Sequence, residues 1–209
     1  MNQERLELFD QWASQYDPAN DLASFPFDGY NKVLDGIVQL AGLSETATVL
    51  DLGTGTANLA AKFVARGCEV WGLDFSNEML TEAKKSLPEA HFLQADLLSD
   101  LPVELPESFD CIVSGYVFHE FSVQDKLLIL TRVAKRLNPG GSILIGDIAF
   151  ENSEKLEFAK QLHGSLWDDD EFYWTADEMV TVLEQAQFQI EYVQVSGCAG
   201  IFILTPSST

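Results

Sequence analysis

The chain has 209 residues, of which 46% are hydrophobic and 22% charged, a composition typical of a single globular domain with one core. Its formal net charge of −21 repels phosphate backbones and anionic membranes, so we expect neither a nucleic acid nor a membrane as partner. The same charge would also serve as a simple solubility trait. No apolar run approaches the roughly 20 residues of a membrane helix, and the acidic start lacks the pattern of a secretion signal. We therefore expect a cytoplasmic protein.

The first 42 residues read as helical. Apolar residues recur at helical spacing in the opening segment, at Leu6, Phe9, Trp12, Ala13 and Tyr16. A second helix is predicted over residues 29–42, ending near Gly42.

From residue 48 the pattern changes to short apolar strands alternating with helices. Strands are predicted at 48–52, 68–74, 90–96, 109–118 and 142–150. Between them, helices are predicted from Asn58 to Arg66, from Ser76 to Leu87, and from Ser122 to the turn "NPGG". Such alternation predicts a doubly wound α/β domain, a mostly parallel sheet covered on both faces.

The C-terminal segment breaks this alternation. A helix opened by "TADE" is followed by two strands, 188–195 and 200–205, with only "SGCA" between them. A parallel crossover needs about a dozen residues or more, so these two strands must form an antiparallel hairpin. The complete prediction is a seven-stranded sheet in one domain.

Polar residues end the first predicted strand. In open α/β sheets, ligands bind beyond the carboxyl ends of the strands, and here Asp51 precedes a turn containing Gly53 and Gly55. A plain tight turn is the simplest interpretation of the glycine pair. A dinucleotide fingerprint requires a third glycine where Asn58 stands, and Asp51 would face a pyrophosphate unfavourably. A carboxylate at this place suits a cationic ligand.

Two further acids end the next strands. Asp74 lies 19 positions after Gly55, the spacing of an acid that binds ribose hydroxyls, although it would also be favoured as a helix N-terminal acid. Asp96 ends the third strand, where it would accept a hydrogen bond from an adenine amino group or cap a turn.

Taken together, these segments resemble the class I S-adenosylmethionine-dependent methyltransferases. The matching motifs are "VLDLGTGTA", "GLDFSNEML", "QADL", "FDCIVSGYVFHE" and "LNPGGSILIGD", in order and at family-like spacing. The terminal hairpin is similar to the one that separates this fold from dinucleotide-binding dehydrogenases. Through "FDQWASQYD" and "DIAFEN" the chain looks most like a group of small, uncharacterised bacterial methyltransferases.

The resemblance implies S-adenosylmethionine as cofactor and S-adenosylhomocysteine as product. It places Asp51 near the cofactor's amino group, Gly53 and Gly55 along the methionine portion, Asp74 on the ribose, and Asp96 with Leu97 on the adenine. The other cofactor residues that it implies are Tyr16, Thr54, Phe75, Met79 and Ser114. The family often has glycine where Ala57 stands; because alanine favours a helix start, we expect binding to survive this departure.

On the acceptor side, the segment after the fourth strand would face the transferred methyl group. His119 is the candidate general base, because its ordinary pKa lies near neutral pH, but it would equally serve to orient the loop. Tyr116 would line the methyl pocket or pack, and Glu120 is expected on the helix side or facing solvent rather than in catalysis. The predicted substrate residues are Trp12, Tyr30, Trp167 and Trp174.

The resemblance also divides the chain by role. Residues 1–42 would cap the cofactor site, 43–150 form the cofactor-binding core, 151–175 form an acceptor-site insertion, and 176–209 form the last helix and hairpin. The acidic run from Asp168 to Asp170 has no histidine beside it in the sequence, so we predict no metal. Three single cysteines without CxxC spacing indicate buried free thiols.

The function that follows is methyl transfer to a small molecule, on oxygen, nitrogen or sulfur, by a monomer or homodimer. Two alternatives stay open. One is an NAD-dependent oxidoreductase, disfavoured by Asp51, Asn58 and the hairpin. The other is a non-catalytic protein that binds S-adenosylmethionine or S-adenosylhomocysteine, which would have the same fold and cofactor site.

Overall fold

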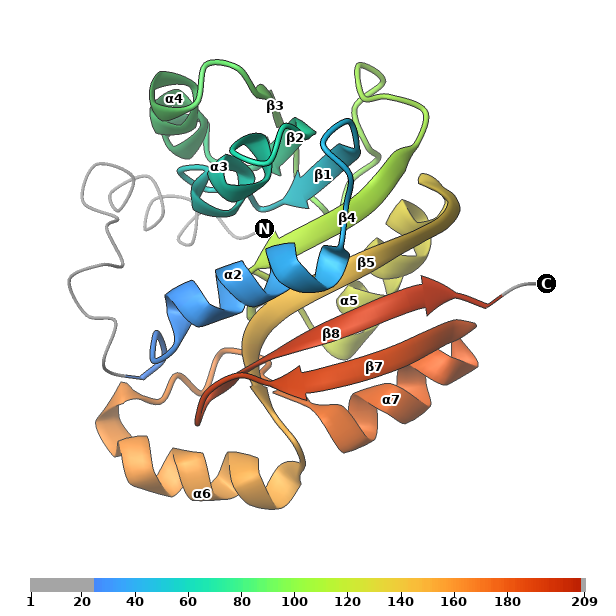
Figure 1. Cartoon of the computed structure of the whole chain (residues 1–209). Coiled ribbons are helices and arrows are strands. Elements are labelled where there is room, and N and C mark those ends of the chain that lie inside the picture. Colours follow the sequence, from blue (N-terminus) through green and yellow to red (C-terminus); the bar gives the residue numbers. More distant parts are fainter. Residues whose placement is uncertain (1–24, 208–209) are drawn as a thin grey trace.

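One sheet of eight strands organises the chain (Figure 1). The computed structural model describes residues 25–207. The strands are β1 Thr48–Leu52, β2 Glu69–Asp74, β3 His91–Gln94, β4 Phe109–Gly115, β5 Leu137–Phe150, β6 Trp174–Thr175, β7 Phe188–Gln194 and β8 Ala199–Pro206. Their order is β3-β2-β1-β4-β5-β8-β7, and the short β6 pairs with β5 to one side of this path. The predicted α/β fold class is thereby confirmed.

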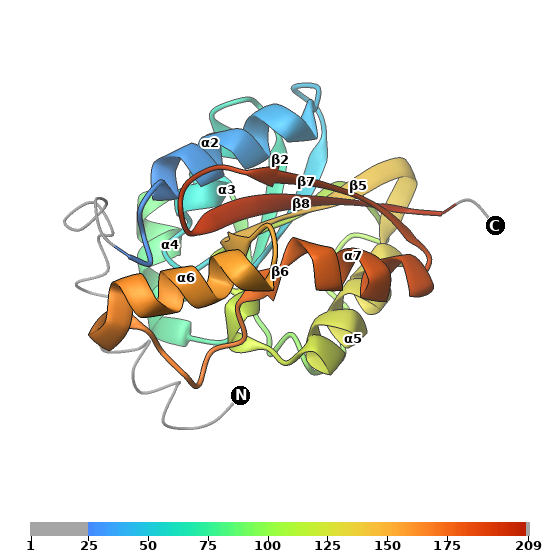
Figure 2. The ribbon, with the colours of Figure 1, turned by 90° about the horizontal axis from the view of Figure 1, so that it is seen from below.

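Helices cover both faces of the sheet (Figure 2). They are α2 Tyr30–Ala41, α3 Asn58–Val64, α4 Asn77–Ser86, α5 Val123–Ala134, α6 Ser153–His163 and α7 Ala176–Gln185. One hydrophobic cluster joins α2, α3 and α4 to one face of the sheet, and a second joins α5 and α7 to the other face. The carboxyl ends of the parallel strands therefore stay accessible between two packed layers.

Two helices begin at the predicted N-caps. The Ser76 hydroxyl accepts a hydrogen bond from the Met79 N–H at 3.1 Å. Ser122 accepts one from the Asp125 N–H at 3.2 Å and donates its own hydroxyl to the Asp125 carboxylate at 2.8 Å. Each cap satisfies a backbone N–H that a helix start leaves without an intrahelical partner. The caps thus fix where the chain turns from a strand end into a helix.

The C-terminal hairpin is present as predicted. β7 and β8 pair antiparallel from Phe188 opposite Pro206 to Gln194 opposite Gly200. β8 also pairs antiparallel with β5, so the hairpin adds to the sheet with its second strand innermost. The parallel part of the sheet, β3-β2-β1-β4-β5, is left to form the ligand-binding edge.

Segment 151–175 contains a helix that the sequence analysis did not predict. α6 begins after Asn152, whose side chain accepts a hydrogen bond from the Lys155 N–H at 3.0 Å. Ala159 is its one buried residue, while Phe158 and Leu162 are exposed. A helix that buries so little does not show the apolar stripe by which helices are recognised in sequence.

The predicted free thiols are confirmed, because Cys68, Cys111 and Cys198 are buried and unbridged. Within residues 25–207, no helix combines the length and apolarity needed to cross a membrane. The predicted first helix, with Trp12 and Tyr16, lies outside the described residues.

Candidate active site

A pocket opens at the carboxyl ends of β1, β2 and β4, where α/β sheets bind their ligands. Ten of its lining residues are among the predicted site residues: Tyr30, Asp51, Gly53, Thr54, Gly55, Asp74, Phe75, Met79, Leu97 and Tyr116. The structure thus brings together residues that the sequence spreads over almost 90 positions.

The loop after β1 has a backbone that requires glycine. Gly53 and Gly55 have φ angles of 69° and 53°, in the left-handed region. A Cβ on Gly53 would lie 2.5 Å from the Val117 side chain, whereas nothing lies within 4 Å of the Cβ position of Gly55. The backbone at Gly55 is therefore open to close approach by a ligand.

Ala57 has a different role from the one predicted. It is the N-cap of α3 with a φ of 74°, so it precedes the helix instead of starting it. A left-handed alanine costs about 1 kcal/mol relative to the right-handed region. High helix propensity does not explain the alanine here, since this position favours the glycine that the family often has.

Asp51 has one carboxylate oxygen without a partner. The residue exposes 1% of its surface, and its Oδ2 accepts the Thr54 hydroxyl at 2.8 Å. Oδ1 is buried, and no group in residues 25–207 forms a hydrogen bond with it. Burial raises the pKa of Asp51 from 3.8 to about 7, with the nearby Asp74 adding to the shift and the Thr54 hydroxyl opposing it. A bound ligand would supply the missing hydrogen bond to Oδ1, and a cationic ligand would do so most favourably.

Asp74 accepts hydrogen bonds from the glycine loop and from the N-cap of α4. Its Oδ2 accepts the Gly55 N–H at 2.8 Å, and its Oδ1 accepts the Ser76 N–H at 2.9 Å. The predicted ribose-binding acid therefore also holds two backbone segments at the pocket. Both oxygens of Asp74 thus accept backbone N–H groups at the edge of the pocket, where a ligand hydroxyl would meet this carboxylate.

Two predicted cofactor residues do not line the pocket. The carboxylate of Asp96 accepts the Leu98 N–H at 3.0 Å, the turn-capping alternative, while its neighbours Ala95 and Leu97 face the pocket. Ser114 is fully buried and donates its hydroxyl to the Leu52 carbonyl at 2.7 Å, joining β4 to β1. Ser114 is positioned by β4, and Asp96 by the turn that follows β3.

Aromatic rings form one wall of the pocket. The Tyr30 and Tyr116 rings have centroids 5.0 Å apart, and Phe27 lies 6.0 Å from Tyr116. Tyr116 has a φ of 57°, a strained conformation for a residue with a side chain, and its buried hydroxyl has no hydrogen-bond partner. Burial raises the pKa of Tyr116 above its ordinary range, so the phenol stays protonated and available as a donor.

Within residues 25–207, the pocket is lined by Glu120 but not by its neighbour His119. Its Nδ1 is 2.6 Å from Oδ1 of Asp147, and its backbone N–H donates to Oδ2 at 2.8 Å. Burial alone would lower the pKa of His119, but the Asp147 carboxylate, with Glu171 and Glu120 adding to it, raises the pKa to about 9. The ring of the unliganded protein is therefore protonated at neutral pH.

Of the two positions expected for Glu120, the structure gives the helix side and not open solvent, because the residue belongs to the 3-10 helix Phe118–Glu120. It lines the pocket, and its side chain is 9% exposed, near Glu171 from the segment before β6. The two predicted tryptophans are elsewhere. Trp174 is 1% exposed and packs on Phe202, and Trp167 packs on Phe25, so both belong to hydrophobic packing away from the lining.

Other lining residues were missed by the sequence analysis: Leu34, Thr56, Asn58, Leu59, Ala95, Gly115, Val117 and Phe121. Most adjoin a predicted site residue, so the loop and strand-end positions already pointed to them. Leu34 comes from α2, and no motif marks it.

The comparisons with known proteins agree with this geometry. Residues 49–141 match the family model described as a methyltransferase domain. An uncharacterised methyltransferase of Geobacillus kaustophilus is 32% identical over 207 residues, covering 93% of each chain. The chain belongs to the methyltransferase family. A relative of this methyltransferase in Bacillus mycoides, also an uncharacterised methyltransferase, is 31% identical over 90% of this chain and 92% of its own.

Solved structures share the fold of this methyltransferase. One is described as the DhpI-SAM-HEP complex, with a TM-score of 0.75, 19% identity and coverage of 97% of this chain and 96% of its own. Another is magnesium protoporphyrin IX methyltransferase from Synechocystis with bound SAH, with a TM-score of 0.71, 16% identity and coverage of 97% and 100%. The resemblance to class I S-adenosylmethionine-dependent methyltransferases is confirmed, and the oxidoreductase alternative is set aside.

Proposed function

We propose that this S-adenosylmethionine-dependent methyltransferase acts on a small-molecule acceptor, at oxygen, nitrogen or sulfur, in the cytoplasm and as a monomer or homodimer. The cofactor goes with the family, and solved relatives of the fold are complexes with SAM and with SAH. A small acceptor is supported by the net charge of −21, which repels polyanionic substrates.

One observation carries the cofactor assignment. Oδ1 of Asp51 is buried and without a partner at the end of the central strand, beside a loop open at Gly55. The ammonium group of S-adenosylmethionine would donate to this oxygen. The methionine portion would then run along Gly53 and Gly55, and the ribose hydroxyls would reach Asp74.

The remaining roles follow from position along the pocket. Ala95 and Leu97 would contact the adenine, with Phe75 and Met79 beside them. Tyr30 and Tyr116 would face the sulfonium, because aromatic faces attract cations. Methyl transfer is an in-line displacement, so the main task of this wall is to position the acceptor and exclude water.

His119 is the proposed general base for an acceptor that must lose a proton. Asp147 holds the ring through Nδ1, which directs Nε2 toward Glu120 at the pocket wall. Because the ring is protonated at neutral pH, it would accept a proton only after losing the one it carries. The variant His119→Ala should lose turnover on such an acceptor by at least about 100-fold while S-adenosylhomocysteine binding is kept.

Thermal unfolding in the presence of single ligands tests the cofactor. A ligand at about 100 times its Kd adds about 2.7 kcal/mol to the free energy of unfolding, which raises Tm by several degrees. We expect this shift with S-adenosylmethionine and S-adenosylhomocysteine and none with NAD. A shift with NAD alone would contradict the proposal.

Turnover is tested by S-adenosylhomocysteine formation with a panel of alcohols, carboxylic acids, amines and thiols. Methylation of at least one class supports the enzyme. If the chain binds S-adenosylhomocysteine but methylates none of the four classes, the non-catalytic alternative replaces the enzymatic one.

A further inference from the structure

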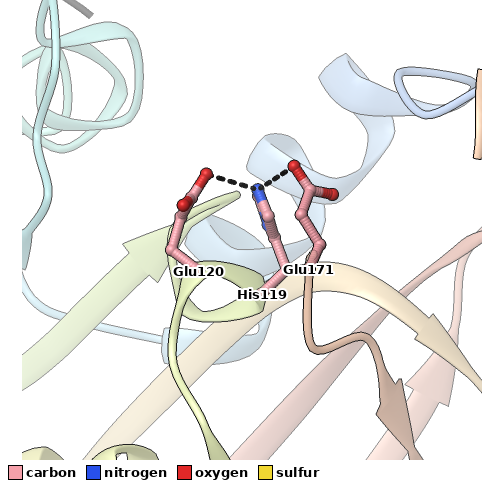
Figure 3. A group of neighbouring side chains, drawn as sticks. All are labelled: His119, Glu120 and Glu171. Atoms are coloured by element: carbon pink, nitrogen blue, oxygen red, sulfur yellow. Dashed lines mark ion pairs between the residues drawn. The ribbon is translucent and has the colours of Figure 1, made fainter. Parts of the chain in front are cut away.

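Three potential metal ligands converge beside the pocket, and Glu120 is the one of them that lines it. His119 and Glu120 belong to the short 3-10 helix Phe118–Glu120 after β4, and Glu171 precedes β6. Figure 3 shows Nε2 of His119 between the two carboxylates, and the three donor atoms all lie within 4.8 Å of one another. Their side chains are 11%, 9% and 15% exposed, so they form a partly enclosed group.

The histidine ring is held with Nε2 directed into this group. Asp147 is fully buried and accepts the His119 ring at Nδ1, and it also accepts the Ile148 N–H at 2.8 Å and the Trp174 indole N–H at 3.2 Å. His119 is 9% exposed, and its Nε2 makes no hydrogen bond to any residue in the range 25–207. A ring held through one nitrogen by a carboxylate, with the other nitrogen turned to a cavity, is the usual arrangement of a metal-binding histidine.

Separate contacts hold Glu171 opposite Glu120. The Phe172 N–H donates to the His119 carbonyl at 2.7 Å, tying the segment before β6 to the 3-10 helix. The Phe172 carbonyl in turn accepts the ammonium of Lys126, which is 1% exposed and lies under the Trp174 ring. The segment that carries Glu171 is therefore held beside the 3-10 helix by the backbone of Phe172.

The spacing of the donor atoms fits a shared ion better than direct pairing. Nε2 lies 3.8 Å from Oε1 of Glu120 and 3.9 Å from Oε1 of Glu171. A charge-assisted hydrogen bond would bring each pair to about 2.8 Å. Two ligand atoms about 2.0–2.2 Å from one tetrahedral ion are about 3.3–3.6 Å apart. The two histidine–carboxylate pairs reach this spacing by moving a few tenths of an ångström, and the two carboxylates start within 4.8 Å of each other.

We propose that His119, Glu120 and Glu171 bind one divalent cation, with Asp147 as the positioning residue behind the histidine. An imidazole with two carboxylates suits Zn²⁺ or Mn²⁺ better than Mg²⁺ or Ca²⁺, which prefer oxygen ligands alone. The sequence predicts no metal because the acids near Asp168 have no histidine beside them. In the folded chain, His119 lies near Glu171, although the two are 52 positions apart in the sequence. A cation on Nε2 would displace the proton that the unliganded ring carries at neutral pH and release it to solvent, so His119 would act either as cation ligand or as general base, and not as both.

The site would give the pocket a means of binding and polarising an acceptor oxygen. Glu120 lines the pocket, so open coordination positions of the cation would be within reach of a molecule bound there. Cation binding goes beyond the proposed methyl transfer and does not depend on it. The two are therefore tested separately.

Cation binding is measured on the chelator-treated full chain by calorimetry with ZnCl₂, MnCl₂ and MgCl₂, and by the loss of free Mn²⁺ signal in electron paramagnetic resonance. We expect one Zn²⁺ or Mn²⁺ per chain and much weaker Mg²⁺ binding. Glu171→Gln and His119→Gln should each weaken binding at least tenfold, as should Asp147→Asn. Because His119 and Asp147 are buried, Glu171→Gln is the decisive variant.

The matched control is Asp169→Asn, which removes a nearby exposed carboxylate that pairs with Lys160 at 2.5 Å. It should leave the cation affinity unchanged. Binding that fails to saturate at one cation per chain, or that Glu171→Gln does not weaken, would overturn the proposal and leave the three side chains as an ion-pair group. S-adenosylhomocysteine binding measured with chelator present reports on the proposed function alone.

Discussion

Two buried carboxylates near the pocket have opposite surroundings. Asp51, near the end of β1, and Asp147, near the end of β5, expose 1% and 0% of their surfaces. Both oxygens of Asp147 accept hydrogen bonds, from two backbone N–H groups, an indole and the His119 ring. Asp51 has the Thr54 hydroxyl on one oxygen and no partner on the other. Groups of the protein itself donate hydrogen bonds to both oxygens of Asp147. Within residues 25–207 no group donates to Oδ1 of Asp51, so a bound ligand would have to supply that hydrogen bond.

This difference separates a carboxylate that supports the fold from one that is kept for a ligand. Burial of a charged group is unfavourable unless hydrogen bonds compensate it, so Asp147 should stabilise the fold and Asp51 should destabilise the unliganded protein. Four predictions test the contrast and a fifth tests the backbone of the glycine loop, from the largest expected effect to the smallest.

Removing the satisfied carboxylate should have the largest effect. In Asp147→Ala, the His119 ring, the Ile148 N–H and the Trp174 indole all lose their acceptor. Breaking such a buried charged network costs about 3–5 kcal/mol of unfolding free energy. Urea denaturation measures this loss, and a decrease below about 1 kcal/mol would mean that Asp147 does not support the fold.

Asp51→Asn should have the opposite effect on stability. A pKa raised from 3.8 to about 7 corresponds to roughly 4 kcal/mol of unfavourable ionisation energy above pH 7, so the variant should be stabilised by about 2–4 kcal/mol at pH 8. Its affinity for S-adenosylhomocysteine should fall about 10–100-fold, because a charge-assisted hydrogen bond is lost. Urea denaturation and ligand titration measure the two effects.

The control for this variant is Asp110→Asn, at the opposite end of the sheet. Asp110 accepts the Thr48 N–H at 2.9 Å and the Asn138 amide at 2.8 Å. The substitution should lower stability without changing ligand affinity. If Asp51→Asn behaves in the same way as this control, the contrast between the two buried carboxylates is wrong.

The contrast also predicts a pH dependence. Between about pH 4 and pH 7 the folded, unliganded chain keeps the Asp51 proton that the unfolded chain has lost. The contribution of Asp51 to stability should therefore fall by about 1.4 kcal/mol for each unit of rising pH in this window, and stay constant above it. The difference in unfolding free energy between the wild type and Asp51→Asn, measured at several pH values, separates the contribution of Asp51 from those of the other acidic residues.

Ligand affinity should change in the opposite direction with pH. The ammonium of S-adenosylhomocysteine binds the ionised carboxylate, so affinity should weaken by up to about tenfold for each unit below pH 7. Titrations at several pH values measure this slope for the wild type. A slope of the same size in Asp51→Asn would assign the effect to another group.

The smallest effect is expected at Ala57→Gly. Glycine relieves the left-handed φ of 74°, but the unfolded chain gains freedom and a buried methyl group is lost. These terms nearly cancel, so stability should change by less than about 1 kcal/mol, and cofactor affinity should be unchanged. A loss above about 2 kcal/mol would show that the methyl group is needed for packing against the pocket.

The two sides of the pocket also differ in how far sequence predicts them. On the cofactor side, Asp51, Gly53, Gly55 and Asp74 lie within 24 consecutive residues, directly after two predicted strands. Because parallel strands end at one edge, their spacing alone predicts that they meet. The strands, their parallel order and the terminal hairpin follow from the same local patterns.

The acceptor side depends on contacts that no local pattern encodes. Glu171 lies between α6 and β6 in the chain. It reaches His119 because α6, which buries one residue, turns the chain back and β6 then pairs with β5. Trp174 was assigned to the substrate from aromatic composition, but composition does not show which face of the sheet a ring covers. Ser114 was misplaced for a similar reason, since its side chain turns toward the neighbouring strand.

The contact between Gly53 and Val117 limits how this protein can be redesigned. A Cβ on Gly53 would lie 2.5 Å from the valine side chain, and the φ of 69° would remain unfavourable even beside a smaller residue. In a library that varies both positions, glycine should persist at 53 while 117 accepts smaller residues. Efforts to change acceptor preference should therefore begin at Tyr30 and Glu120, two lining residues whose φ angles lie outside the left-handed region.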